Sequence, residues 1–239
     1  MERVLIIGAS SGIGEALARE FSLRGYVVGM ASRRIELLNR IKQELPNTSY
    51  VKHLDLLRPD EARLALRELI SEMGGADIIV INSGVGHENA ELVWELERPS
   101  IDVNVLGFTA MAVEASNYFI KKGRGHLVGI SSVAGLRPFR LAPAYGASKA
   151  FIIFYLKGLR HKFKKQGVDV VVTDIRPGFV DTPLTEGNTK MFWVSTSQKA
   201  AEQIFNAIKA RKEVAYITKR WRLIAFIIGL VPDFIYNRL

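Results

Sequence analysis

The chain has 239 residues, of which 48% are hydrophobic, and it carries a formal net charge of +9. That length suits one α/β domain, and that apolar content is enough for a full core, which excludes a disordered or fibrous protein. The absence of cysteine excludes disulfides, a thiol nucleophile and a zinc–thiolate site. The four histidines lack the spacing of metal ligands, so we expect no bound metal.

The positive charge is concentrated in residues 157–165 and in the last thirty residues. A nucleic-acid-binding protein needs a basic face interleaved with exposed aromatic residues, or a known binding fold, and neither is evident, so we expect no nucleic-acid partner. Phosphorylated cofactors or anionic membranes account for such a surface at least as well. Because MERVLIIGAS runs as a strand straight into a turn, we see no signal peptide and expect a cytoplasmic protein.

Short apolar runs alternate with helical patterns along the chain. The runs that predict strands are residues 4–8, 26–32, 50–56, 77–83, 126–132, 168–175 and 213–218. Between them, segments such as 13–25 and 59–74 carry apolar residues at steps of three and four, and both end at glycine. Several strands are apolar on both faces, which is typical of strands covered by helices on both sides. The alternation therefore predicts an α/β fold with a doubly wound parallel sheet of about seven strands, in which ligands bind beyond the carboxyl ends of the strands.

The first strand runs into GASSGIG, residues 8–14, which opens the first helix. Glycine permits a positive φ angle and close approach of the backbone to a ligand, and the helix N-terminus offers free N–H groups to a phosphate. This context predicts a phosphate-binding turn, with a tight turn that binds nothing as the alternative. Its candidate cofactor contacts are Gly8, Ser10, Ser11, Gly12, Ile13 and Gly14.

The second strand ends in Ser32, Arg33 and Arg34. A dinucleotide fold that selects NAD usually carries an acid here for the ribose 2′-hydroxyl, whereas arginine accommodates the 2′-phosphate of NADP. Guanidinium–phosphate contacts are strong and often bidentate. We therefore expect NADP(H) to be preferred over NAD(H), with an ordinary solvated basic loop as the alternative.

Two tyrosine–lysine pairs share a spacing of four residues, which puts both side chains on one face of a helix. Tyr145 and Lys149 form one pair, in YGASK, and Tyr118 and Lys122 form the other, in YFIKK. Spacing alone does not distinguish a catalytic pair from an ordinary one.

The surrounding motifs make that distinction. The glycine turn has the spacing G-x-x-x-G-x-G, and it is followed by NSG (82–84), VNVLG (103–107), ISS (130–132), YGASK (145–149) and RPG (176–178). In this order and spacing, over residues 1 to about 218, the motifs resemble those of the short-chain dehydrogenase/reductase family. The resemblance implies a single Rossmann-type catalytic domain over residues 1–218, an NAD(P) cofactor and interconversion of a carbonyl and an alcohol by hydride transfer. It also implies a homodimer or homotetramer.

The resemblance assigns catalytic roles to Asn104, Ser132, Tyr145 and Lys149. Ser132 precedes Tyr145 by thirteen residues, whereas no comparable serine precedes Tyr118, so we expect Tyr118–Lys122 to be a surface or interface pair. Tyr145 would be the general acid/base, and the ammonium of Lys149 would lower the phenol pKa from its usual value of about 10. The family's lysine also holds the nicotinamide ribose, its serine binds the substrate oxygen, and its asparagine organises a water. A purely structural role is the alternative for each of the four.

Further cofactor contacts follow from the same resemblance: Asp55, Leu56, Asn82, Gly84, Tyr145, Lys149, Pro177, Gly178, Val180 and Thr182. For Asp55 the alternative is a helix cap, since aspartate is a common N-cap residue. Many NADP-preferring relatives carry a basic residue just before the second glycine of the turn. Ser11 stands there in this chain, so the NADP preference depends on Arg33 and Arg34.

The predicted substrate side is the loop 181–196, whose threonines, glycine and asparagine suit a mobile lid. Met191, Phe192 and Trp193, with Phe139 and Leu141 opposite, could form an apolar wall and favour a hydrophobic carbonyl substrate. The competing functions are a non-catalytic NADPH-binding regulatory or assembly module, and a relative that performs epimerisation or dehydration without net cofactor turnover.

The tail, residues 219–239, combines a basic–aromatic entry with the apolar run 223–231. Nine apolar residues are far fewer than the roughly 20 needed to span a bilayer. Two interpretations therefore remain open. The tail could be buried against the domain or a partner subunit, or it could make peripheral contact with an anionic membrane surface.

Overall fold

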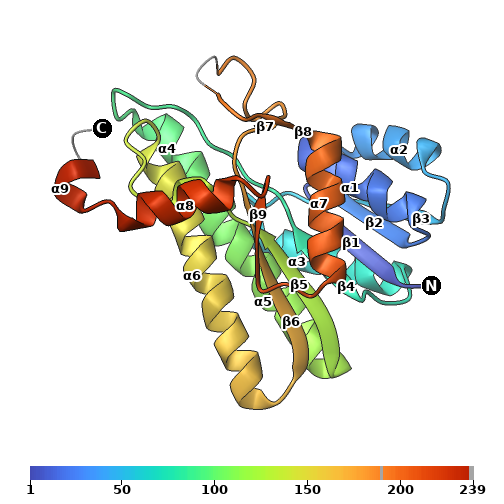
Figure 1. The fold of residues 1–239 in the computed structure, drawn as a ribbon. Helices are drawn as coiled ribbons and strands as arrows, with labels where there is room; N and C mark the ends of the chain where they lie inside the picture. Colours follow the sequence, from blue (N-terminus) through green and yellow to red (C-terminus); the bar gives the residue numbers. More distant parts are fainter. Residues whose placement is uncertain (189–190, 237–239) are drawn as a thin grey trace.

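Seven parallel strands form the central sheet of the computed structural model, which describes residues 1–188 and 191–236 (Figure 1). Their spatial order is β3-β2-β1-β4-β5-β6-β9, and every neighbouring pair is parallel. Their bounds are β1 (Arg3–Ile7), β2 (Val27–Ser32), β3 (Ser49–His53), β4 (Ile78–Ile81), β5 (Arg124–Ile130), β6 (Asp169–Pro177) and β9 (Val214–Ile217). The predicted doubly wound parallel sheet is thus confirmed. Two short strands, β7 (Val180–Asp181) and β8 (Ser195–Thr196), pair separately.

Helices cover both faces of this sheet (Figure 1). One layer consists of α1 (Gly12–Leu23), α2 (Ile35–Glu44) and α7 (Ser197–Lys209), and the other of α3 (Pro59–Glu72), α5 (Phe108–Lys122) and α6 (Pro143–Gln166). The remaining helical segments are α4 (Trp94–Ile101), the π-helical turn η1 (Asp102–Gly107), the 3₁₀ turn η2 (Val133–Gly135), α8 (Trp221–Leu230) and α9 (Asp233–Tyr236).

The strands are apolar on both faces because each face has its own core. Along β1, Val4 and Ile6 pack into the core under α1, α2 and α7, while Leu5 and Ile7 pack into the core under α3, α5 and α6. All four side chains are fully buried. Successive side chains of a strand point to opposite faces, so a run of consecutive apolar residues is needed when both faces are covered.

The order of the strands positions the ligand site. From β1 the chain passes outward through β2 and β3, and then returns to place β4 on the other side of β1. The connections after β1 and β4 therefore leave the sheet in opposite directions and open a crevice at the carboxyl ends of these strands. Beyond β9, α8 and α9 extend on this same side of the sheet (Figure 1).

The Tyr118–Lys122 pair lies at the opposite end of the sheet and joins α5 to the segment that enters β4. The backbone N–H of Ala76 donates to the Tyr118 hydroxyl at 2.9 Å, and Lys122 Nζ lies 2.6 Å from a carboxylate oxygen of Asp77. Both side chains are half-buried. The expected surface or interface pair is therefore a structural pair, because the loop before β4 folds against it.

Candidate active site

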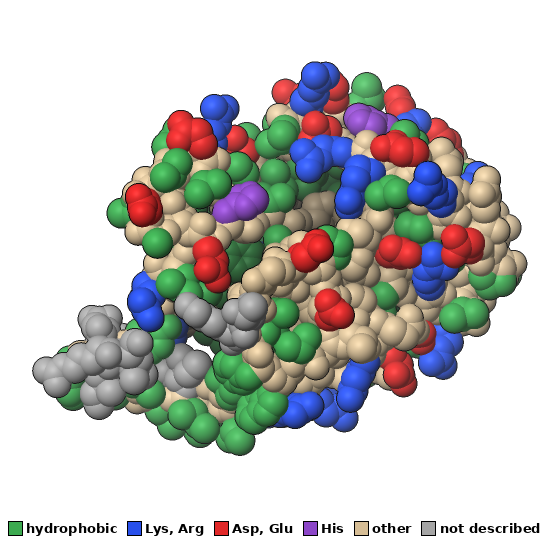
Figure 2. Space-filling view, turned by 90° about the horizontal axis from the view of Figure 1, so that it is seen from above, with side chains coloured by type: hydrophobic (Ala, Val, Ile, Leu, Met, Phe, Trp, Pro, Cys, Tyr) green, Lys and Arg blue, Asp and Glu red, His purple; other side chains and the backbone are tan. Residues whose placement is uncertain are grey.

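A cleft lies beyond the carboxyl ends of the central strands, and Figure 2 shows it as a hollow. Its lining includes every predicted cofactor contact except Gly14: Gly8, Ser10, Ser11, Gly12, Ile13, Ser32, Arg33, Arg34, Asp55, Leu56, Asn82, Gly84, Tyr145, Lys149, Pro177, Gly178, Val180 and Thr182. Ser132 also lines it. The structure thus brings together residues that lie up to 174 positions apart, from Gly8 to Thr182 (182 − 8).

The glycine turn forms the floor of the cleft at the start of α1. Gly8 and Gly12 have φ angles of +89° and +58°, which L-residues with side chains rarely adopt. Asn82 supports the turn by donating from Nδ2 to the carbonyl of Gly8 at 2.8 Å. Gly14 lies beneath the turn, where a Cβ atom would be only 2.0 Å from the carbonyl oxygen of Gly8. Gly14 therefore permits close packing of helix on turn, while the N-terminus of α1 faces the cleft with its free N–H groups.

Two exposed arginines stand at the rim where β2 ends. The guanidinium of Arg34 donates to the hydroxyls of Ser10 at 2.9 Å and Ser11 at 2.7 Å. The buried hydroxyl of Ser32 accepts from the backbone N–H of Arg34 at 3.1 Å. Lys and Arg side chains are visible beside the hollow in Figure 2. These contacts hold a positive charge directly above the glycine turn, and they connect two motifs that are far apart in the sequence.

Tyr145 and Lys149 reach the cleft from the first turns of α6. Lys149 is 3% exposed, its Nζ donates to the carbonyl of Ile130 at 3.1 Å, and it lies 5.7 Å from the centre of the Tyr145 ring. Glycines make room for both side chains. A Cβ atom on Gly84 would be 3.1 Å from Lys149 Nζ, and one on Gly86 would be 2.3 Å from the Tyr145 ring.

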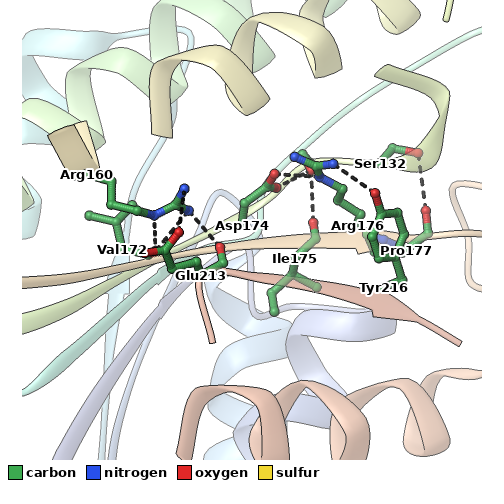
Figure 3. Close-up of polar contacts among 10 residues, drawn as sticks. Ser132, Arg160, Val172, Asp174, Ile175, Arg176, Pro177, Glu213 and Tyr216 are labelled. Carbon is green, nitrogen blue, oxygen red and sulfur yellow. Dashed lines mark hydrogen bonds and ion pairs between the residues drawn. The ribbon is translucent and has the colours of Figure 1, made fainter. Parts of the chain in front are cut away.

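Ser132 follows the end of β5 and caps the short turn η2. Its Oγ accepts from the N–H of Ala134 at 3.1 Å. It donates to the carbonyl of Pro177 at 3.4 Å (Figure 3). Ser132 also acts on the phenol of Tyr145, whose pKa it lowers against the larger effect of burial. The hydroxyl is held between η2 and the end of β6, in the cleft that Tyr145 also lines.

Burial shifts the pKa values of the Tyr145–Lys149 pair. Loss of solvation lowers the pKa of Lys149 to about 8, against the opposing effect of the Asp174 carboxylate. Burial raises the pKa of Tyr145 above its usual value, and the hydrogen bond with Ser132 opposes this only in part. The expected lowering of the tyrosine pKa by the lysine is therefore wrong for the protein alone. The ammonium lies over the face of the ring, and desolvation of the phenol is the largest cause of the shift.

Asn104 lies in η1 and is fully buried. Its Oδ1 accepts from the N–H of Val85 at 2.9 Å, and its Nδ2 donates to the carbonyl of Val85 at 2.7 Å and to Ser148 Oγ at 2.9 Å. The side chain thus ties the segment after β4 to α6 between Tyr145 and Lys149. The water relay predicted for Asn104 stays a prediction.

A buried polar network lies directly behind the site (Figure 3). Asp174 accepts from Ser131 Oγ at 2.5 Å and from Arg176 Nε at 2.7 Å, and Arg176 donates to the hydroxyl of Tyr216 at 3.0 Å. Asp174 is 1% exposed, so the guanidinium and the hydroxyl compensate for the loss of solvation of its charge. Sequence reasoning missed this network, although an acid and a base two positions apart inside an apolar strand were a visible signal.

The lining also includes residues that were not predicted as cofactor contacts: Leu54, Ser83, Val85, Val103, Ile130, Ser131, Pro183, Leu184 and Thr185. Four of them lie inside the recognised motifs, residues 183–185 belong to the predicted substrate loop 181–196, and Leu54 and Val85 each stand next to a predicted contact. Asp55 lies at the cleft, and its Oδ1 accepts from the N–H of Leu57 at 3.1 Å. The N-cap of α3 is Arg58, so the alternative of a helix cap at Asp55 is wrong.

The predicted apolar wall lies elsewhere. Met191, Phe192, Trp193, Phe139 and Leu141 are absent from the lining of the cleft. Phe192 and Trp193 instead pack with Phe179 and Trp221, with ring centres 5.2–6.3 Å apart. In the described ranges, 1–188 and 191–236, no group of three or more metal-binding side chains is present.

A glycine turn at a helix N-terminus, opening on a cleft at the carboxyl ends of a doubly wound parallel sheet, defines a Rossmann-type nucleotide-binding protein. Comparison with known proteins then identifies the family. The model of the family described as short chain dehydrogenase matches residues 2–216. The chain therefore belongs to the short-chain dehydrogenase/reductase family of oxidoreductases.

Individual relatives agree with this assignment. An uncharacterised oxidoreductase of Myxococcus xanthus is 40% identical over 189 residues, which cover 77% of this chain and 74% of the relative. The NADP-dependent 3-hydroxy acid dehydrogenase YdfG of Escherichia coli (strain K12) is 33% identical over 183 residues, covering 74% and 72%. Among solved structures, the 3-ketoacyl-(acyl-carrier-protein) reductase of Brucella melitensis, complexed with NADH, superposes with a TM-score of 0.81 at 25% identity, covering 90% and 95%.

Proposed function

We propose that the protein is an NADPH-dependent oxidoreductase that interconverts a ketone or aldehyde with its alcohol, with Tyr145 as general acid/base. One observation carries the proposal: Tyr145, Lys149 and Ser132 converge in the cleft that also holds the glycine turn and the arginine rim. The alternative of a non-catalytic NADPH-binding module is not favoured, because the chain belongs to a family of oxidoreductases.

The residues of the cleft fit a dinucleotide. The positive φ angles of Gly8 and Gly12 and the N-terminus of α1 suit a pyrophosphate. A Cβ atom at residue 84 would come within 3.1 Å of Lys149 Nζ, so glycine keeps space open beside that ammonium. The nicotinamide half would lie against Lys149, Val180 and Thr182, and the adenine half against Asp55 and Leu56. Bound nicotinamide cofactor supplies the hydride.

The protein's own side chains would donate the proton and orient the substrate. Ser132 and Tyr145 would both hydrogen-bond the carbonyl oxygen, which places the carbonyl carbon toward the cofactor side of the cleft. Because burial raises the pKa of Tyr145, the phenol is protonated at neutral pH and ready to donate to that oxygen. The Lys149 ammonium would then stabilise the resulting phenolate.

Preference for NADP(H) over NAD(H) is part of this proposal. Arg34 stands above the glycine turn with its guanidinium held by Ser10 and Ser11. One relative is by name NADP-dependent, whereas a solved relative was complexed with NADH, so the support comes chiefly from the arginines of this chain.

The proposal extends to the substrate and the assembly. We propose a hydrophobic carbonyl substrate, a cytoplasmic location and a homodimer or homotetramer formed through α5 and α6. Phe154 on α6 is 74% exposed, which suits an interface between copies. We also propose residues 1–218 as the catalytic unit, with residues 219–239 as a basic and apolar tail that packs on the domain, a partner subunit or a membrane surface.

The test is NADPH consumption against ketones and aldehydes graded in size and polarity. We expect turnover that increases with apolar surface and falls by at least about a hundredfold in Tyr145→Phe, because general acid catalysis contributes about 10²–10⁴-fold. Tyr118→Phe is the matched control, since that tyrosine has the same spacing to a lysine but lies at the far end of the sheet. Tight NADPH binding with no turnover of any compound would contradict the proposal. Product formation without NADPH loss would point to epimerisation or dehydration.

A further inference from the structure

The helix α8 has one face packed on the domain. Trp221 is 5% exposed, and its ring packs so tightly on Gly178 that a Cβ atom there would come within 2.1 Å of it. The tail continues along the loop before α6, where Tyr236 donates its hydroxyl proton to the carbonyl of Pro138 at 2.9 Å and Arg137 stacks on the Tyr236 ring. These contacts hold the helix in a defined orientation at the rim of the cleft.

The opposite face of α8 is apolar and exposed. Leu223, Phe226, Ile227 and Leu230 are 60%, 65%, 51% and 67% exposed. Their positions are i, i+3, i+4 and i+7, so they form one continuous line along the helix. We call these four residues the outer stripe. Phe234 of α9, 67% exposed, adds a further apolar side chain beyond the end of the stripe. Figure 2 shows hydrophobic side chains at this edge of the molecule.

Positive charge flanks the stripe at its N-terminal end. Lys219, Arg220 and Arg222 are exposed, and residues 219–232 contain no aspartate or glutamate. Cations at a helix N-terminus oppose the helix macrodipole, so the charges of these three residues do not stabilise the start of α8. Arg220 in addition lies over the ring of Trp193, 5.4 Å from its centre. The placement of the three basic residues beside an exposed apolar stripe matches the layout of an interfacial helix, in which apolar side chains enter the lipid and basic side chains meet the headgroups.

We propose that the outer stripe binds the surface of a bilayer containing anionic lipid, with Lys219, Arg220 and Arg222 at the headgroups. The helix has ten residues and so extends about 15 Å, at 1.5 Å per residue. Among the described residues, no helix has the length and apolar character needed to cross a membrane. The helix therefore lies in the plane of the interface.

A second copy of the chain fits the stripe less well. A symmetric pairing would bring the three cations of each copy to the same contact, without a carboxylate between residues 219 and 232 to pair with them. Four side chains on one short helix also provide far less surface than the roughly 800 Å² per partner of a standard stable interface. Anionic lipid instead complements both the apolar stripe and the cations.

Binding there would place the lipid surface next to the cleft, because Trp221 of α8 packs on Gly178, which lines it. This consequence rests on the proposed function: a hydrophobic carbonyl compound dissolved in the bilayer would reach the site without crossing water. The docking itself does not depend on catalysis, and it can be measured separately.

The test is sedimentation of the full-length protein with vesicles of phosphatidylcholine alone or mixed with phosphatidylglycerol. We expect binding to the mixed vesicles that weakens with salt. It should fall at least tenfold in the double variant Phe226→Glu/Leu230→Glu and in the triple variant Lys219→Gln/Arg220→Gln/Arg222→Gln. The matched control is Leu64→Glu, a comparably exposed leucine (52%) on α3. Point variants are preferable to truncation, because removal of residues 219–239 would also remove Trp221 from Gly178.

Equal vesicle binding by the native chain and the double variant would overturn the proposal. A double variant that loses a dimer in sedimentation equilibrium while it keeps its vesicle binding would also overturn it, in favour of a second copy. Turnover of a water-soluble ketone, measured in the same samples, separates failure of docking from failure of the proposed function. Loss of turnover with intact vesicle binding would count only against the proposed function and not against membrane docking.

Discussion

At the scale of single residues, the site depends on charges whose protonation the fold has altered. Lys149 is buried, and its pKa falls to about 8, while burial raises the pKa of Tyr145. At neutral pH the lysine is therefore mostly charged and the tyrosine neutral. This is the protonation state that the proposed carbonyl reduction requires.

The first residue-scale prediction is a decline of carbonyl reduction at alkaline pH. Lys149 loses its proton above about pH 8, well below the usual 10.5, so kcat/KM for reduction should be level below pH 7 and fall above pH 8. Lys149→Arg keeps its charge throughout this range and should show a lower rate without that decline. The measurement is the pH profile of both proteins, and an unchanged alkaline decline in the variant would contradict the assignment.

The second residue-scale prediction concerns cofactor choice. Arg34→Ala removes a guanidinium from above the glycine turn and should weaken NADPH binding by about ten- to a hundredfold, with little effect on NADH. That range corresponds to the roughly 1.5–3 kcal/mol of a hydrogen bond to a charged group. Titration of both cofactors measures it, and Arg40→Ala, an exposed arginine outside the cleft, is the control. Equal weakening of both cofactors would exclude a 2′-phosphate contact.

At the scale of elements, the start of α6 is held by a carboxylate from α4. Glu97 Oε2 accepts from the N–H of Ala144 at 2.7 Å, and its Oε1 accepts from Nδ2 of the buried Asn89 at 2.7 Å. The first turn of a helix leaves its N–H groups unpaired, and an anion there also interacts favourably with the helix dipole. Glu97 therefore positions the turn that carries Tyr145.

We accordingly predict that Glu97→Ala destabilises the protein by about 1 kcal/mol, as the loss of a helix cap does. It should also lower kcat severalfold more than it raises KM, because Tyr145 is displaced while the rest of the cleft is intact. Thermal unfolding and steady-state kinetics measure the two effects. Glu95→Ala, an exposed acid on the same helix, should change neither, and Glu97→Gln should recover part of the stability.

At the scale of the whole molecule, the two ends of the sheet have different roles. The carboxyl end holds the cleft and the tail, while the amino end holds Tyr118, Lys122 and Asp77 in a structural contact (Figure 1). The proposed association with other copies of the chain would use the sides of α5 and α6 that are turned away from the sheet. Phe154 and Val113 are exposed there, at 74% and 36%.

We predict that Phe154→Glu dissociates the proposed oligomer. A charge placed at the centre of an apolar interface loses its hydration without gaining a partner, which is strongly unfavourable. Sedimentation velocity would measure the change, with Leu64→Glu on α3 as the control, and unfolding experiments should give similar stability for both variants. A native chain that is already monomeric at high concentration would contradict the proposed assembly.

The sequence by itself determined the features that depend on neighbours along the chain. Each of the seven predicted strands overlaps an observed one, with ends shifted by at most three residues, as in 126–132 against Arg124–Ile130. The glycine turn and the helix that begins at Pro59 were also predicted, since φ preferences and unpaired helix N–H groups are local properties. Most residues of the cleft were predicted from the resemblance of the motifs, in their order and spacing, to those of the family.

Only the tertiary structure decided what depends on distant partners and on burial. The Asp174–Arg176–Tyr216 network, the Glu97 contact at α6 and the packing of Trp221 on Gly178 join segments between 40 and 47 residues apart. The raised pKa of Tyr145 reverses the sequence-based expectation, because desolvation depends on the whole surrounding fold. The two faces of α8 could not be separated from the sequence, since both are apolar. Packing on the domain buries Trp221 and partly covers Ile224 and Ala225, and it leaves the outer stripe exposed.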